Sequence, residues 1–122
     1  AKAVAKVLPE LAGKFDGMAV RVPTMDVSLV DLSVVTEKPV NVDELNAAMA
    51  KAAAGSLAGV LEVAEAPLVS ADYIGHPASS IYDSALTRVQ GERLVKLFAW
   101  YDNEWGFANR MLDLSAYVGA SA

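Results

Sequence analysis

Apolar positions recur along this chain with two periods, and each period predicts one kind of element. Spacings of three and four residues predict helices, and alternation at every second residue predicts strands. Helical spacing covers residues 4–11, 45–52 and 107–118. Strand patterns cover residues 18–22, 27–37, 60–63, 68–71, 87–90 and 94–101, with a further strand around Ile81. The chain is therefore predicted to be α+β, with a mostly antiparallel or mixed sheet covered on one face by about three helices.

Turn and cap residues set the limits of these elements. Pro9 should end the first helix near Leu8, because proline blocks helix continuation. Asn41 and Glu44 have the spacing of a capping box, and they predict the start of the second helix. The strands 87–90 and 94–101 flank a short segment that contains Gly91. That arrangement is typical of a hairpin.

The most informative corner is W-Y-D-N-E-W-G, residues 100–106. An apolar strand enters it and a helical pattern leaves it, with Asn103 in the N-cap position. A helix start offers free N–H groups and the positive end of the dipole, which favour a ligand. A side-chain amide can also donate and accept at once. From the residues alone, Asp102 and Asn103 are either helix caps or part of a ligand site.

Arg21 lies in the predicted strand 18–22, just before V-P-T. A guanidinium at such a position either lies on the solvated face or binds an anion through two hydrogen bonds. The spacing leaves both interpretations open.

His76 is the only histidine, and it lies in the turn Gly75-His76-Pro77. A catalytic histidine needs a nucleophile or an orienting carboxylate within reach, and none is adjacent in sequence. His76 is therefore interpreted as a surface-loop histidine. Ser79 and Ser80 have no accompanying general base.

Composition narrows the classes of function. The 122 residues are 54% apolar and 20% charged, which is typical of one globular domain. The net charge of −5 argues against nucleic-acid binding. No signal peptide and no membrane-spanning run is visible. The chain has no cysteine, hence no cysteine–metal cluster and no thiol nucleophile, and no metal site is expected. There is also no G-x-G-x-x-G motif, so no dinucleotide-binding half is predicted. On periodicity alone the chain could be a non-catalytic α+β binding module.

The motif W-Y-D-N-E-W-G-F-A-N-R, residues 100–110, closely resembles the last strand and helix start of phosphorylating glyceraldehyde-3-phosphate dehydrogenases. M-A-V-R-V-P-T (18–24) and P-A-S-S-I (77–81) resemble further segments of that family, in the family's order. The resemblance covers essentially residues 1–122. It implies the C-terminal part of the catalytic domain, with the dinucleotide-binding domain and the segment bearing the catalytic cysteine and histidine outside this chain.

The resemblance also implies roles for two residues. Arg21 matches the arginine that helps bind the substrate phosphate, and Asn103 matches the asparagine that hydrogen-bonds the nicotinamide carboxamide. The reaction implied is oxidation and phosphorylation of an aldehyde sugar phosphate in glycolysis, with hydride passing to NAD; NADP is left open. The implied partners are the sugar phosphate, inorganic phosphate and the other subunits of a cytoplasmic homotetramer.

A second enzyme is left open within the same resemblance. Erythrose-4-phosphate dehydrogenases share N-E-W-G-F-A-N-R, including Phe107 where the commoner pattern has tyrosine. Tyr101 and P-A-S-S favour the glyceraldehyde 3-phosphate enzymes.

Overall fold

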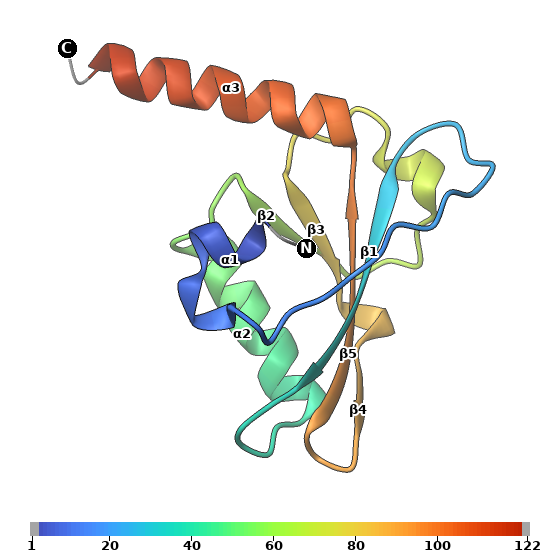
Figure 1. Cartoon of the computed structure of the whole chain (residues 1–122). Helices are drawn as coiled ribbons and strands as arrows, with labels where there is room; N and C mark the ends of the chain where they lie inside the picture. The colour runs from blue at the N-terminus through green and yellow to red at the C-terminus, as the bar shows by residue number, and fades with distance from the viewer. Residues whose placement is uncertain (1–2, 121–122) are drawn as a thin grey trace.

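A computed structural model describes residues 3–120 of the chain (Figure 1). Over these residues it contains one five-stranded mixed sheet and three α-helices. The predicted α+β class is therefore confirmed. The strands are β1 (Ser28–Val35), β2 (Leu61–Ala64), β3 (Ser80–Asp83), β4 (Arg88–Gln90) and β5 (Leu94–Tyr101). The α-helices are α1 (Val4–Val7), α2 (Val42–Ala54) and α3 (Asn103–Ala120), and short 3₁₀ turns span Pro9–Leu11, Ser70–Tyr73 and Ser84–Leu86.

Strand β5 is the centre of the sheet. The strand order is β1-β5-β3-β2, and β4 also pairs with β5. Strands β1, β3 and β4 run antiparallel to β5, whereas β2 runs parallel to β3. The predicted β4–β5 hairpin is confirmed, with residues 91–93 as its loop. β1 pairs with β5 along its whole length, so Ser28 lies opposite Tyr101. The start of β1 is therefore next to the end of β5.

The predicted cap signals explain where the helices begin and end. Helix α1 stops at Val7, before Pro9. At α2, Asn41 Oδ1 accepts the Glu44 N–H at 2.9 Å and Glu44 accepts the Asn41 N–H at 3.3 Å, which confirms the capping box. α3 follows β5 directly and runs away from the sheet (Figure 1), and Gly106 is its one buried residue. Within residues 3–120, no helix is both long and apolar enough to cross a bilayer.

The core lies between the sheet and the segments around the 3₁₀ turn 70–73. Tyr73 stacks on Trp100 with ring centroids 5.6 Å apart, and both pack with buried apolar residues. A second buried centre is polar: the Tyr82 hydroxyl donates to Asn46 Oδ1 at 2.7 Å and also bonds the Thr87 hydroxyl. The buried apolar residues of the core around Tyr73 and Trp100 are Val27, Ala64, Tyr73, Ala78 and Ile81.

Two predicted strands are wrong. Residues 18–22 are irregular and exposed, with Met18 91% and Val20 74% accessible. Alternation makes a strand only when a neighbouring strand supplies hydrogen bonds, and this segment has no such neighbour among the described residues. Residues 68–71 were also predicted as a strand, but the chain forms the 3₁₀ turn from Ser70. There the Asp72 carboxylate accepts the Val69 N–H at 2.8 Å and closes the turn.

Candidate functional site

The candidate site lies where β5 ends and α3 begins, and Asp102 organises it. Its side chain is buried, with 4% accessible surface. One carboxylate oxygen accepts the Trp105 N–H at 3.0 Å, and the other accepts the Gly75 N–H at 2.8 Å. The Asp102 carbonyl accepts the Gly106 N–H at 3.0 Å, the first hydrogen bond of the helix. Asp102 therefore caps α3 and ties it to the loop at Gly75.

Asn103 does not cap the helix, contrary to the sequence prediction. The helix begins at Asn103 itself, so the cap position falls one residue earlier. The Asn103 side chain instead turns toward β1, where its Oδ1 accepts the Ser28 hydroxyl at 2.8 Å. Its amide N–H groups make no hydrogen bond among residues 3–120. Because Asn103 is also exposed, these donors remain available to a ligand.

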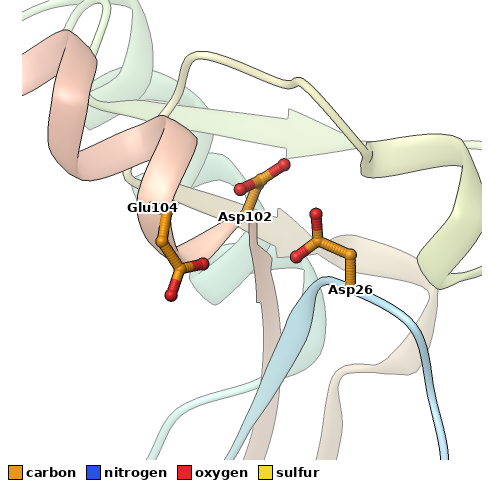
Figure 2. Close-up of side chains that lie close together, drawn as sticks. All are labelled: Asp26, Asp102 and Glu104. Carbon is orange, nitrogen blue, oxygen red and sulfur yellow. The ribbon is translucent and has the colours of Figure 1, made fainter.

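Three carboxylates meet at the same corner (Figure 2). Single oxygens of Asp26, Asp102 and Glu104 lie within 4.8 Å of one another. Carboxylate oxygens are the ligands that Ca²⁺ and Mg²⁺ prefer. Both oxygens of Asp102, however, already accept backbone N–H groups, and Asp26 accepts the Val27 N–H at 2.7 Å. These bonds explain the cluster as turn and cap chemistry, and the negative charge suits the positive end of the α3 dipole.

Arg21 does not belong to the β5–α3 junction. It belongs to the irregular segment before β1, and it is exposed. Its guanidinium makes no hydrogen bond or ion pair within the described residues. It is therefore free to bind an anion, but no contact among residues 3–120 holds it against Asn103.

His76 lies in a loop, as predicted, but it is less isolated than the sequence suggested. Its Nδ1 accepts the Ala78 N–H at 3.2 Å, and its Nε2 lies 3.4 Å from a Glu62 carboxylate oxygen. The acceptor role of Nδ1 places the proton of the neutral ring on Nε2, toward Glu62. The neighbouring Ser79 hydroxyl contacts Arg110, at 3.3 Å. No nucleophile is paired with His76 among residues 3–120.

Comparison with known proteins identifies the family to which the chain belongs. The family model described as the C-terminal domain of glyceraldehyde 3-phosphate dehydrogenase matches residues 1–103. The chain belongs to this family. The resemblance read from the motif at residues 100–110 is thereby confirmed.

Similar proteins are named as glyceraldehyde-3-phosphate dehydrogenases. The chain is 58% identical over 113 residues to the chromosomal glyceraldehyde-3-phosphate dehydrogenase of Cupriavidus necator, which covers 93% of this chain and 33% of that protein. It is 57% identical over 118 residues to glyceraldehyde-3-phosphate dehydrogenase 1 of Bacillus cereus, and the match covers 97% of this chain and 35% of that protein. It is 53% identical over 120 residues to the glyceraldehyde-3-phosphate dehydrogenase of Geobacillus stearothermophilus, and the match covers 98% of this chain and 36% of that protein. The chain thus spans about one third of the length of these glyceraldehyde-3-phosphate dehydrogenases.

Proposed function

We propose that this chain is the later part of the catalytic domain of a phosphorylating glyceraldehyde-3-phosphate dehydrogenase that uses NAD. The observation that carries the proposal is the family match together with the corner at Asn103, where the end of β5 presents an exposed amide. The cysteine nucleophile and histidine base of such an enzyme would be supplied by residues other than these 122, because the chain has no cysteine and its one histidine is engaged elsewhere.

Asn103 is the proposed cofactor residue. The nicotinamide carboxamide has one acceptor and two donors, and a side-chain amide is its complement. The two N–H groups of Asn103 are unengaged within the described residues, so they fit the carboxamide oxygen. NAD, when bound, supplies the acceptor for the hydride of the substrate. The contribution of this chain is to hold one edge of the ring in a fixed orientation.

Arg21 is the proposed ligand of the substrate phosphate. An exposed guanidinium without a partner fits a doubly charged phosphate, which it can bind through two charge-assisted hydrogen bonds. The remaining parts of the proposal rest on family resemblance: inorganic phosphate as second substrate, a homotetramer, and a cytoplasmic location. NADP is left open as an alternative cofactor.

The test is an assay of the full-length dehydrogenase that contains this sequence. NADH formation should require both glyceraldehyde 3-phosphate and inorganic phosphate, and kcat/KM should be higher for glyceraldehyde 3-phosphate than for erythrose 4-phosphate. The opposite ranking would support the erythrose-4-phosphate enzyme. Absence of aldehyde-dependent NADH and NADPH formation would support a non-catalytic binding module instead.

A further inference from the structure

Ser28 is the partner of the Asn103 side chain, although 75 residues separate them. Its Oγ lies 2.8 Å from Asn103 Oδ1 and donates to it. The contact follows from the sheet, because Ser28 pairs with Tyr101 at the last position of the β1–β5 ladder. Two residues beyond Tyr101 the chain has turned into α3, and the Asn103 side chain folds back to the start of β1.

The backbone under Ser28 is held firmly. The preceding residue, Val27, has a φ of 69°, which is strained for a β-branched side chain. Its side chain is only 5% accessible and lies in the core cluster, and its N–H is bound by Asp26 at 2.7 Å. Such an unusual conformation persists only where its surroundings impose it. Core packing on one side and the ladder on the other therefore fix the backbone at Ser28, which keeps its hydroxyl within reach of Asn103.

The Asn103 side chain, by contrast, has little else to hold it. Its backbone is set by the Asp102 cap, but the torsion that turns the amide plane is soft. Within residues 3–120, the Ser28 hydroxyl makes the side-chain hydrogen bond that restrains it. With Oδ1 bound to Ser28, both N–H groups of the amide are left without a hydrogen bond among residues 3–120.

We infer that Ser28 is a positioning residue for the cofactor: its hydroxyl turns the Asn103 amide so that the nitrogen donates to the carboxamide oxygen of the nicotinamide. The inference rests on the proposed function of Asn103 and adds a residue to it. Ser28 touches neither substrate nor cofactor in this arrangement. Its effect is to keep Asn103 in the binding orientation before NAD arrives, which lowers the cost of binding.

The experiment compares variants of the full-length dehydrogenase by titration calorimetry with NAD and by steady-state kinetics. Ser28→Ala removes the hydroxyl, whereas Ser28→Thr keeps it and suits a strand. Ser33→Ala is the matched control, because Ser33 lies on the same strand and its hydroxyl bonds only Lys96, at 3.4 Å, within the described part of the chain. Asn103→Ala and the double variant Ser28→Ala/Asn103→Ala complete the set.

Ser28→Ala should weaken NAD binding about three- to tenfold, which is the net effect of one lost hydrogen bond. Ser28→Thr and Ser33→Ala should bind NAD as the parent does. The double variant should bind no more weakly than Asn103→Ala, because Ser28 acts only through that amide. KM for the sugar phosphate and the thermal midpoint should stay unchanged, since an exposed neutral hydrogen bond contributes little to folding.

Two results would overturn the inference in different ways. If Asn103→Ala weakens NAD binding and Ser28→Ala does not, Asn103 keeps its cofactor role and only the role of Ser28 is wrong. If Asn103→Ala leaves NAD affinity unchanged, the cofactor assignment fails and the positioning role fails with it. If Ser28→Ala weakens NAD binding further in the Asn103→Ala background, Ser28 acts on the cofactor by a route other than the Asn103 amide.

Discussion

Asp102 and Asn103 are adjacent, yet burial gives them different roles. Asp102 is 4% accessible, so its charge must be satisfied inside the protein, and two backbone N–H groups do this. Asn103 is exposed and needs no such partner. The sequence predicted Asn103 as the helix cap, and the structure places the cap one residue earlier, at Asp102, because helix limits read from a pattern are uncertain by a residue or two. The pairing of Asn103 with Ser28 was not predictable, because spacing along one chain does not say which strands are neighbours.

A prediction at the residue scale concerns Arg21. In the full-length enzyme, Arg21→Ala should raise KM for the phosphorylated substrate far more than KM for NAD. Loss of a charge-assisted hydrogen bond to phosphate should cost about 1.5–3 kcal/mol of binding. Lys14→Ala is the control, because it removes another exposed positive charge from the segment before β1. Equal, small effects of the two variants on KM would place Arg21 on the solvated surface.

Tyr73 leads to a prediction about alkaline stability. Burial raises the pKa of the Tyr73 phenol above its usual value of 10.0, and the charges of Asp83 and Asp72 add to the effect. The unfolded chain therefore loses this proton at lower pH than the folded chain. The stabilising contribution is fully present below pH 10.0 and is lost as pH rises through the folded pKa. Unfolding free energy should thus decline above pH 10.0.

Tyr73→Phe should reduce this alkaline decline, measured by urea unfolding at a series of pH values. At neutral pH the variant should be as stable as the parent or more so, because the buried Tyr73 hydroxyl has no hydrogen-bond partner among the described residues. The aromatic stacking on Trp100 is kept. Tyr101→Phe, at a side chain that is only partly buried, controls for loss of a tyrosine hydroxyl. A destabilisation of about 1 kcal/mol or more at pH 7 would mean that the hydroxyl has a partner in solution.

At the scale of elements, predictions succeeded where the signal was local. Helix α2 has its cap signal and its apolar spacing within one short segment, and the predicted capping box was correct. The β4–β5 hairpin likewise depends on adjacent residues. The predicted strand at 18–22 failed because a strand is completed by hydrogen bonds from elsewhere in the chain. The prediction of a strand at 68–71 failed because the carboxylate of the next residue, Asp72, closes a turn, which the apolar pattern does not reveal.

The junction of β5 and α3 provides a test at this scale. Asp102→Ala removes the helix cap and leaves the Gly75 N–H without its acceptor, so it should lower the free energy of unfolding by about 2–4 kcal/mol. Asp113→Ala is the matched control on α3, since Asp113 is 66% accessible and its ion pair with Arg110 should be worth less than about 1 kcal/mol. Urea unfolding measures both variants. Equal losses of unfolding free energy in the two variants would mean that the buried Asp102 carboxylate is not what ties α3 to the loop at Gly75.

For the whole molecule, large exposed apolar side chains are the dominant feature of two regions. One is the segment before β1, where Met18 and Met25 are 91% and 100% accessible. The other is α3, where Phe107, Leu112 and Tyr117 are each more than half accessible. Extended apolar surfaces are typical of protein that contacts other protein. They fit the proposal that residues 1–122 work as part of a longer dehydrogenase, since the relatives matched are about three times as long.

The last prediction follows from that proposal. The 122-residue chain by itself should not reduce NAD in the presence of glyceraldehyde 3-phosphate and phosphate. It has no thiol to attack the aldehyde. Its one histidine is held by the Ala78 N–H, and no nucleophile is paired with it among residues 3–120. The assay is NADH absorbance with the purified chain, and the full-length enzyme at equal molarity is the positive control. Aldehyde-dependent NADH formation by the chain, surviving purification from host dehydrogenase, would show that catalysis uses groups within these residues.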